Sequence, residues 1–497
     1  MIESKNFAWV LVLTVSCALN FSCQTTDYIQ TEKEAKPSVV SQTRTDSADT
    51  FYKGADLSYV NELEDCGVKY TVDGVEEDVY ELMSDYGANM IRLRLWHNAT
   101  WTNYSNLTDV KRSINRAKDA NMSVLLDFHY SDTWTDPEQN LIPAAWLPVA
   151  NDLDALADSV YNYTYATLES LRQSNCLPVA VQIGNETNNN ILVTDNSLLL
   201  PINTSRNVQL FNAGISAVND FNTAYNLDIK TCLHIAHDLT SAMNWVISIK
   251  SNGILDFDWL GMSYYPQWQR YTPAELGAFT AQLLDTYDIQ VLVAETGHIW
   301  TRDWDDQCHN LMSLMAPGYP ETPCPQLQKD YLIEVKNAIR DNGGAGVLAW
   351  EPAWVSSTNV TLWGVGSNWE NVTFFDCDYN LLTHGGIEFL SENNVEVTFT
   401  VDMSAANAPG YITGEFTADA YGNWQIIPMI QVGNSSIYTF KTYLTQGQSG
   451  AYYYLKDDDW SARETVPEDQ QLIWNDRKYD ITTAGLTQTI SNTWVND

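Results

Sequence analysis

The 497-residue chain is too long for one ordinary domain, and its length suits a barrel-sized unit joined to a smaller one. Its formal net charge is −37, from 26 basic and 63 acidic residues. Such a chain repels phosphate backbones, so no nucleic-acid partner is predicted. Because the acidic residues are spread along the whole sequence, we interpret the charge as a solubility feature. The 18 Trp and 27 Tyr are more informative, since aromatic faces stack on sugar rings.

Residues 1–23 have the features of an export segment. An apolar stretch over 7–19 is long enough for a signal peptide and too short for a membrane span. Ser22 and Cys23 follow in a pattern that resembles a bacterial lipoprotein cleavage site, although the two residues before them fit it poorly. We therefore predict an exported protein, either a cell-surface lipoprotein anchored to the outer membrane through Cys23 or a secreted or periplasmic protein without that anchor.

Strand-like and helix-like segments alternate over residues 51–392, after a polar, Ser/Thr-rich stretch (24–50) that we predict to be a disordered linker. This alternation predicts an α/β fold with a parallel sheet. Eight strand-like runs each end in polar or aromatic residues, as in a (β/α)8 TIM barrel, whose active site lies at the carboxyl ends of the strands. The runs cover 52–58, 89–96, 123–134, 179–184, 229–237, 257–266, 289–295 and 345–352.

Two of these runs end on a glutamate. Residues 177–188 (LPVAVQIGNETN) lead to Glu186, and residues 289–297 (IQVLVAETG) lead to Glu295. Paired carboxylates at the ends of two strands are what glycoside hydrolysis requires. One glutamate alone could equally cap a helix or pair with a surface lysine, but two in the same barrel favour catalysis.

The second run places two arginines inside the predicted barrel. Its alternation puts Arg92 and Arg94 on one face and Ile91, Leu93 and Leu95 on the other. Buried arginines need partners, so we predict a carboxylate beside them. The alternative, an edge strand with both arginines in water, is disfavoured by the apolar neighbours.

The cysteines and histidines suggest no metal centre. Cys308 and Cys324 flank a Pro/Gly-rich loop and are the best candidates for a local disulfide, which export would permit. His234 and His237 lie three residues apart without a further ligand at a recognisable spacing, so no metal is predicted there. Three more cysteines lie in or near apolar runs and could equally be buried thiols: Cys66, Cys176 and Cys232.

Residues 393–497 follow a different pattern. Strict alternation over 395–403 and several short strand-like segments separated by Gly, Asn and Asp predict an all-β sandwich domain. Its aromatic residues suit a carbohydrate-binding module, or they could equally form the core of a structural appendage. They are Trp424, Tyr452, Tyr453, Tyr454, Trp460 and Trp474.

Motifs that extend, in order, from the first of these runs to beyond the eighth make the chain from about residue 52 to 390 resemble the family 53 glycoside hydrolases. These are endo-β-1,4-galactanases with a (β/α)8 barrel. The matching stretches are 53–59 (KGADLSY), 91–96 (IRLRLW), 126–137 (LDFHYSDTWTDP), 182–188 (QIGNETN), 261–266 (GMSYYP), 294–296 (AET), 350–354 (WEPAW) and 366–371 (GSNWEN).

The resemblance implies a retaining mechanism with Glu186 as acid/base and Glu295 as nucleophile. It implies that Asn185 binds the sugar 2-hydroxyl, that Arg92 or, as the second choice, Arg94 orients Glu295, and that Tyr264 or Tyr265 donates to Glu295. The remaining residues expected to line the substrate subsites are Asp56, His129, Asp132, Trp134, His234, Trp350 and Trp354.

The expected substrate is β-1,4-galactan, including the type I arabinogalactan side chains of pectin. One alternative is a related barrel that uses the same two glutamates to hydrolyse mannan, xylan or cellulose. An alternative from another class of protein is a non-catalytic glycan-binding lipoprotein. No cofactor is predicted and a monomer is expected. Some bacterial members of the resembled family hold the loops after strands seven and eight with calcium and others with a disulfide; the cysteines here favour the disulfide.

Overall fold

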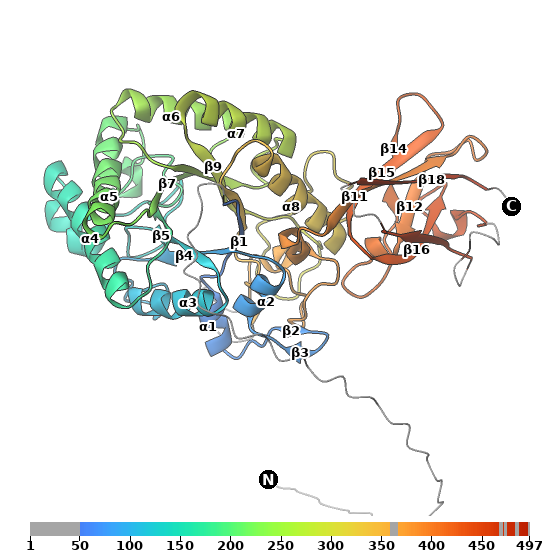
Figure 1. Cartoon of the computed structure of the whole chain (residues 1–497), viewed down its shortest axis with the longest axis horizontal. Coiled ribbons are helices and arrows are strands. Elements are labelled where there is room, and N and C mark those ends of the chain that lie inside the picture. The colour runs from blue at the N-terminus through green and yellow to red at the C-terminus, as the bar shows by residue number, and fades with distance from the viewer. Residues whose placement is uncertain (1–49, 358–365, 467–470, 472–474, 483–486, 496–497) are drawn as a thin grey trace, which may run out of the picture. The chain divides into compact units, whose positions relative to one another are not determined.

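Eight parallel strands close into a barrel in the computed structural model, as the sequence predicts (Figure 1). The structure describes residues 50–357, 366–466, 471, 475–482 and 487–495, so the predicted export segment, the linker and Trp474 lie outside it. Each strand pairs with its neighbours in chain order, and β1 also pairs with β10. The strands are β1 (Tyr52–Asp56), β4 (Met90–Leu95), β5 (Ser123–Phe128), β6 (Ala180–Ile183), β7 (Lys230–Ile235), β8 (Trp259–Tyr264), β9 (Gln290–Thr296) and β10 (Gly346–Ala349).

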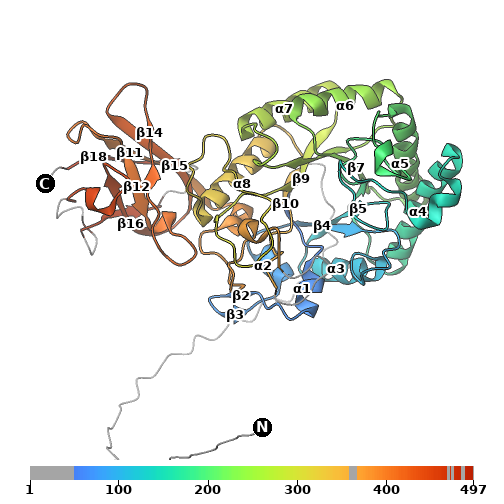
Figure 2. The ribbon, with the colours of Figure 1, turned by 180° about the vertical axis from the view of Figure 1, so that it is seen from behind.

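Helices follow the strands and surround the barrel, as the view from behind also shows (Figure 2). Many begin at a capping side chain; Thr272 and Glu275, for example, form a reciprocal capping box at the start of α7. A small hairpin, β2 (Thr71–Val72) and β3 (Val75–Glu76), lies between the first two helices in the chain. The helices are α1 (Val60–Asp65), α2 (Val79–Asp85), α3 (Leu107–Asp119), α4 (Leu153–Gln173), α5 (Thr204–Tyr225), α6 (Leu239–Ser251), α7 (Pro273–Tyr287) and α8 (Pro325–Arg340).

Some predicted strands are longer than the observed ones. The third run was expected to extend to residue 134, but β5 ends at Phe128. Tyr130, two residues later, has a φ of 50°, which is incompatible with an extended strand. The chain therefore turns away from the sheet, and residues 129–137 form part of the cleft described below.

The barrel interior contains an apolar layer beneath the carboxyl ends of the strands. Its members are buried and belong to one hydrophobic cluster. Such a packed interior makes the fold a solid core and not a pore. The layer consists of Tyr52, Met90, Leu125, Ala180, Cys232, Trp259, Leu292, Ala294, Ala345 and Leu348.

The described residues after 393 form two four-stranded sheets, which confirms the predicted all-β module. The sheets pack through aromatic side chains: the ring centroid of Phe399 lies 4.9 Å from that of Phe416 and 5.0 Å from that of Tyr452. One sheet has the order β14 (Ile430–Gln431), β15 (Ile437–Thr445), β11 (Asn394–Asp402), β18 (Thr487–Thr493), and the other β13 (Ile427–Pro428), β12 (Tyr411–Gly414), β16 (Ser449–Leu455), β17 (Arg477–Asp480).

Strand β18 was not predicted, because its sequence TQTISNT carries a single large apolar residue, Ile490. It adds in parallel to β11, and this pairing depends on backbone hydrogen bonds more than on an apolar face. Among the described residues, no helix is both long enough and apolar enough to cross a membrane.

Candidate active site

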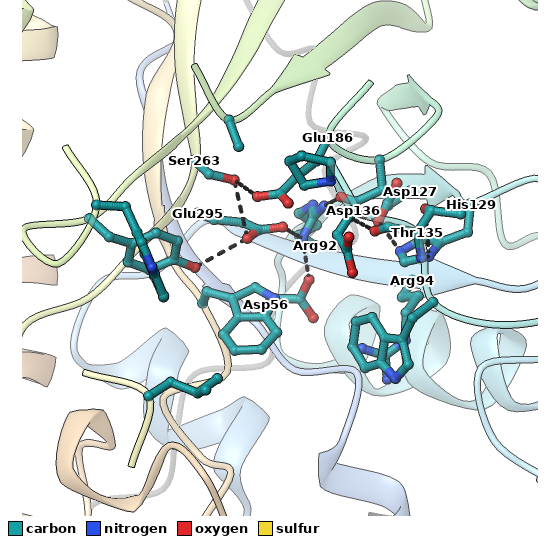
Figure 3. A pocket seen from close by; sticks show the side chains of 18 of the residues that line it. Asp56, Arg92, Arg94, Asp127, His129, Thr135, Asp136, Glu186, Ser263 and Glu295 are labelled. Carbon is teal, nitrogen blue, oxygen red and sulfur yellow. Dashed lines mark hydrogen bonds and ion pairs between the residues drawn. The ribbon is translucent and has the colours of Figure 1, made fainter. Parts of the chain in front are cut away.

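A cleft of about 590 Å³ opens at the carboxyl ends of the barrel strands (Figure 3). Charged groups form its floor, and aromatic rings form much of its wall. This is the end of a (β/α)8 barrel at which active sites are found. The lining residues include Asp56, Arg92, Arg94, Asp127, His129, Trp134, Asp136, Asn185, Glu186, Ser263, Tyr265, Trp268, Gln269, Glu295, Trp350 and Trp369.

Glu186 follows β6 in a turn with unusual backbone angles. Gly184 has a φ of 84° and Glu186 has a φ of 45°. A left-handed conformation at a glutamate is uncommon and is typically maintained where the surroundings require it. The Glu186 N–H donates to Nδ1 of His234 (3.3 Å), and Oε1 of the carboxyl group lies 2.5 Å from the Ser263 hydroxyl oxygen.

Glu295 lies near the end of β9, and its side chain is buried. Its Oε1 is 2.9 Å from Nη1 of Arg92, and its Oε2 accepts from the Tyr265 hydroxyl (3.1 Å) and the Ser263 hydroxyl (3.3 Å). A bulge brings the side chain into the cleft: Met262 of β8 pairs with Val293, whereas Ser263 pairs with Glu295, so β9 carries one extra residue here. Bulges re-aim side chains in this way next to functional sites.

Arg92 is the centre of the buried network beneath the two glutamates. Besides Glu295, its guanidinium pairs with Asp56 (2.8 Å) and Asp127 (2.9 Å) and donates to Asn185 Oδ1 (2.7 Å). The predicted carboxylate partners of the buried arginine are therefore present. Although burial is the largest single influence and acts to raise the pKa of Asp127, Arg92 and His129 together outweigh it, so that pKa is lowered and the carboxylate is held ionised.

The two glutamates differ in their electrostatic surroundings. Burial, followed by the charge of Glu295, raises the pKa of Glu186. Burial also raises the pKa of Glu295, but Arg92 counteracts it through a direct ion pair that Glu186 lacks. Glu295 consequently ionises first, and Glu186 keeps its proton at a pH where an ordinary glutamate would have lost it.

Arg94 has a separate set of partners. Its Nη1 lies 3.6 Å from Oε1 of Glu351, a buried residue whose φ is 43°. The guanidinium carbon lies 4.8 Å from the ring centroid of Tyr59 and 4.1 Å from that of Trp134. Cation–π contact with these rings holds Arg94 in the wall of the cleft, so Arg92 and not Arg94 contacts Glu295.

The structure divides the predicted site residues into two groups. Asn185, Glu186, Glu295, Arg92, Arg94, Asp56, His129, Trp134, Tyr265 and Trp350 line the cleft. Asp132, His234, Tyr264 and Trp354 do not.

The residues outside the cleft support it from behind. Asp132 accepts hydrogen bonds from two backbone N–H groups, those of Asn98 and Ala144, and thereby ties loops together. His234 lies beneath Glu186, and Trp354 stacks on Tyr59 with a centroid distance of 4.4 Å. In the structure these three side chains contact other parts of the protein, and their expected contact with substrate remains a prediction.

The two tyrosines at the end of β8 also separate. Tyr265 donates to Glu295, whereas the hydroxyl of Tyr264 donates to the backbone oxygen of Tyr271, outside the cleft. Successive strand residues point to opposite faces, so only one of two adjacent tyrosines can face the barrel interior.

Several cleft residues were missed at the sequence level. Ser263 stands directly before the two tyrosines in GMSYYP, but a serine in a strand carries no signal of its own. Gln182, which donates to Asp127 (2.6 Å) and accepts from Arg92 (3.0 Å), is likewise invisible without its partners. Only the alternation of the strand, in which Gln182 lies two residues after the inward-facing Ala180, could have placed it on the inner face.

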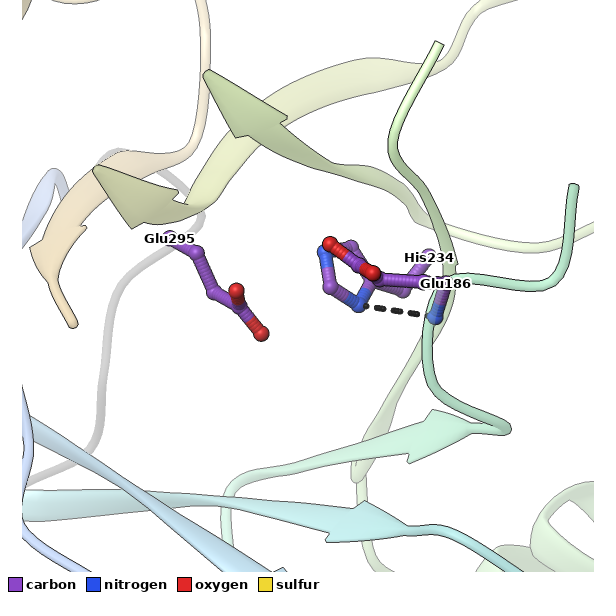
Figure 4. A group of neighbouring side chains, drawn as sticks. All are labelled: Glu186, His234 and Glu295. Carbon is purple, nitrogen blue, oxygen red and sulfur yellow. Dashed lines mark hydrogen bonds between the residues drawn. The ribbon is translucent and has the colours of Figure 1, made fainter. Parts of the chain in front are cut away.

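A metal ion does not fit the centre of the cleft. Glu186, His234 and Glu295 each offer a ligand atom, and these atoms lie within 4.8 Å of one another (Figure 4). However, the Ser263 hydroxyl already contacts all three, at 2.5, 3.0 and 3.3 Å. The guanidinium of Arg92 beside Glu295 adds a positive charge that opposes a second cation.

The loops after β9 and β10 also lack a suitable ligand set for calcium in their described part. The Ser356 hydroxyl lies within hydrogen-bond distance of both Asp306 and Glu370 and can donate to one of them at a time, and the N–H groups of Ser367 and Asp305 donate to the same two carboxylates. Ca²⁺ needs six to eight oxygen ligands that face it freely. Here the oxygens face donors instead.

The predicted disulfide between Cys308 and Cys324 is not formed. Cys324 is fully buried at the start of α8, where burial raises its pKa to about 12, whereas Cys308 lies in a partly exposed loop. The sequence pattern showed a shared loop but not that one cysteine is sequestered by the helix. Cys176 and Cys232 are buried thiols, as the alternative prediction had it.

Comparison with known proteins agrees with this geometry. Residues 52–384 match the model of glycosyl hydrolase family 53. The chain is 47% identical to an arabinogalactan endo-beta-1,4-galactanase of Cellvibrio japonicus over 329 residues (66% of this chain, 86% of the relative). It is 31% identical to an endo-beta-1,4-galactanase of Bacillus subtilis over 339 residues (64% and 76%).

Solved structures give the same result. The GH53 catalytic domain of Ignisphaera aggregans is 29% identical, with a TM-score of 0.61, over 71% of this chain and 99% of that one. A structure from a study of two fungal beta-1,4-galactanases is 26% identical, with a TM-score of 0.58, over 68% and 98%. With the barrel, the paired glutamates and the family match in agreement, the chain belongs to glycosyl hydrolase family 53.

Proposed function

We propose that this protein is a retaining endo-β-1,4-galactanase that hydrolyses β-1,4-galactan, including type I arabinogalactan side chains of pectin. One observation carries the mechanism: an oxygen of Glu186 and an oxygen of Glu295 lie within 4.8 Å of each other in the cleft. Retaining enzymes keep their carboxyl groups ~5 Å apart, whereas inverting enzymes need ~6.5–9.5 Å to admit a water molecule between them.

In the first step, Glu295 attacks the anomeric carbon while Glu186 gives its proton to the leaving glycosidic oxygen. Arg92 and Tyr265 hold Glu295 ionised and oriented, so one oxygen can face the sugar. Burial and the charge of Glu295 keep Glu186 protonated until the bond breaks. The product is a galactosyl ester of Glu295.

In the second step, Glu186 acts as the base. Having lost its proton, it takes one from a water molecule that attacks the anomeric carbon and releases Glu295. Two displacements restore the original configuration. Asn185 lies at the cleft with its Nδ2 donating to the Thr135 oxygen and its Oδ1 accepting from Arg92, and its contact with the sugar 2-hydroxyl remains a prediction.

The wall of the cleft suits a polysaccharide chain. Trp134 and Trp350 line it, and Trp268, which is 55% exposed, lies in the same lining. Aromatic faces stack on the C–H faces of pyranose rings. An open cleft with several aromatic surfaces favours binding within a chain over binding at its end, which supports the endo mode of action.

Reducing-sugar release from pectic galactan, with mannan, xylan and cellulose alongside, tests this function. Galactan should be cut into short oligomers and the other glycans should not. Cleavage of another β-1,4-glycan would keep the two glutamates but change the specificity. No release from any of them would favour the alternative of a glycan-binding protein without catalysis.

We also infer that the C-terminal module binds glycan. Trp424, Tyr453 and Trp460 form a cluster with ring centroids 6.3–6.4 Å apart, and Trp460 is 41% exposed. In gels containing galactan, the Trp460→Ala variant should be retarded less than the wild type. Ile430→Ala, which removes an exposed apolar group from the other sheet, is the matched control and should change nothing.

Export and lipid anchoring complete the proposal. The apolar N-terminal segment and Cys23 support an outer-membrane lipoprotein that meets its polysaccharide outside the cell. Labelling with a fatty acid in a bacterial host should mark the wild type and not Cys23→Ser, while Cys17→Ser should still be labelled. Light scattering of the mature protein tests the expected monomer.

A further inference from the structure

The Ser263 hydroxyl lies between the two glutamates and touches both. Its oxygen is 2.5 Å from Oε1 of Glu186, 3.3 Å from Oε2 of Glu295 and 3.0 Å from Nε2 of His234. Ser263 is buried, and the bulge between β8 and β9 pairs its backbone with that of Glu295. Neither the double displacement itself nor the sequence motifs assign this side chain a role.

A hydroxyl carries one proton, so it cannot donate to all three neighbours at once. The protonation state of His234 decides which of these hydrogen bonds the serine accepts. Burial, followed by Arg92, lowers its pKa well below the ordinary value, so the ring is neutral and carries a single N–H. That N–H lies on only one of the two ring nitrogens.

The donors around His234 assign the N–H to Nε2. The backbone N–H of Glu186 (3.3 Å) and Nε2 of Gln182 (3.1 Å) both point to Nδ1, which therefore acts as an acceptor. Asn185 Oδ1 also lies 2.9 Å from Nδ1, but an N–H on Nδ1 would oppose the N–H of Glu186 that points at the same atom. The Nε2–H then donates to Ser263, and the serine proton is left for one of the two carboxyl groups.

We propose that Ser263 is a positioning residue shared by both glutamates, whose hydroxyl turns to donate to whichever carboxylate is ionised. Before substrate binds, the O–H of Glu186 hydrogen-bonds to the serine oxygen, and the serine O–H hydrogen-bonds to ionised Glu295. In the glycosyl ester, Glu295 is neutral and Glu186 is ionised, so the hydroxyl turns back to Glu186. No proton leaves the serine. The hydroxyl hydrogen rotates about the C–O bond, while His234 holds the oxygen in place.

This arrangement favours the state of the pair that holds one proton. In that state the hydroxyl accepts from one glutamate and donates to the other, whereas with both glutamates ionised it makes only one of these bonds. The other charged groups that face Glu186 are Asp136 from the loop after β5 and Arg92 from β4. Neither contacts Ser263, so their effect on the pair is the same with and without the hydroxyl.

The test is kinetic, and it rests on the proposed function because it needs a hydrolysed substrate. With an aryl β-1,4-galactobioside that has a good leaving group, kcat/KM reports the first step and kcat reports the second. Ser263→Ala should lower both by a similar factor of about 10 to 100, because one hydroxyl serves both steps. Ser263→Cys, which keeps the shape but donates weakly, should behave like Ser263→Ala, and Ser263→Thr should restore most of both constants.

The pH profile separates this role from a merely structural one. Loss of the shared hydroxyl should shift the acidic limb of the pH profile of kcat/KM to higher pH and the basic limb to lower pH. A hydroxyl that only donated to ionised Glu186 would instead shift the basic limb to higher pH when removed. Thr296→Val is the matched control: it removes a buried hydroxyl on β9 that donates to the backbone oxygen of Tyr264, so it should lower the melting temperature and leave both limbs in place.

Failure of the proposed function and failure of the proposal for Ser263 would give different results. If the wild type hydrolyses neither galactan nor the aryl galactobioside, the proposed function is wrong. If the wild type is active but Ser263→Ala slows only one step, or leaves both limbs of the pH profile unchanged, the proposed role of Ser263 is wrong while the proposed function stands.

Discussion

Two layers inside the same barrel differ completely in chemistry although only a few residues along each strand separate them. The lower layer is apolar and includes Met90, Leu125, Ala180 and Cys232. Two residues further along the same strands stand Arg92, Asp127, Gln182 and His234, which form a polar network at and directly beneath the floor of the cleft. Because strand side chains alternate with a period of two, one inner face continues from a packed core directly into an active site.

The difference shows how a charged layer can be tolerated so close to a core. The apolar layer is held by close packing, whereas the charged layer is held by mutual pairing: one arginine contacts three carboxylates. A buried charge without a partner would be expensive. Changes in the lower layer should therefore affect stability, and changes in the upper layer should affect chemistry.

The largest expected effect is the loss of activity in Glu186→Gln and in Glu295→Gln. Each should lower kcat on galactan by ~10³-fold or more, because neither proton transfer nor nucleophilic attack has a substitute in the cleft. Folding should be retained, since glutamine fills the same space. Circular dichroism and a melting curve provide the control, and an unfolded variant would contradict the separation of the two layers.

Arg92→Met should break the distinction between the layers. It removes the only arginine that Glu295 contacts among the described residues and leaves three buried carboxylates without it. We expect the free energy of unfolding to fall by ~3–5 kcal/mol and activity to be lost. Denaturant unfolding measures the free energy of unfolding. A variant as stable as the wild type would show that the Arg92 network contributes nothing to the stability of the fold.

Leu125→Ala should act in the opposite way to the glutamate substitutions. It opens a cavity in the apolar layer and should lower the free energy of unfolding by ~2–5 kcal/mol. The kcat of the folded fraction should stay within about twofold of the wild type, because Asp127 and its partners are untouched. A large fall in kcat with an intact fold would mean that the two layers are mechanically coupled.

The last prediction concerns the pH dependence of stability. The pKa of Glu186 is raised in the folded state, so the native protein holds a proton that the unfolded chain has released. The free energy of unfolding relative to Glu186→Gln should therefore fall as the pH rises from the unfolded to the folded pKa, at a slope approaching ~1.4 kcal/mol per pH unit, and then level off. A difference between the two proteins that does not change with pH would contradict the raised pKa.

The sequence predicts the barrel because eight apolar runs end in polar residues, and the alternation of Arg92 and Arg94 already indicates a charged inner face. It does not predict the bulge in β9. In a regular strand, Leu292 and Ala294 would face the interior and Glu295 would face outward, so alternation alone assigns this glutamate to the wrong side. Its position at the end of an apolar run made it a candidate, the resemblance to a known family implied its role, and only the structure explains how it reaches the cleft.

The supporting residues were harder to predict for a related reason. Asp132, His234, Tyr264 and Trp354 have the residue types expected of a sugar-binding wall, but each is turned to a neighbour that the sequence does not place beside it. Residue type and strand position were sufficient for the glutamates. For their neighbours, the contacts across strands decide the orientation.

Trapping of the covalent intermediate tests the central claim most directly. A 2-deoxy-2-fluoro galactobioside with a good leaving group slows the second step more than the first, so the glycosyl ester accumulates and can be located by mass spectrometry of peptides. The label should lie on Glu295, in the peptide that contains VLVAETG, and should be absent from Glu295→Gln. A label on Glu186, or hydrolysis with inversion and no ester, would contradict the assignment of the two glutamates.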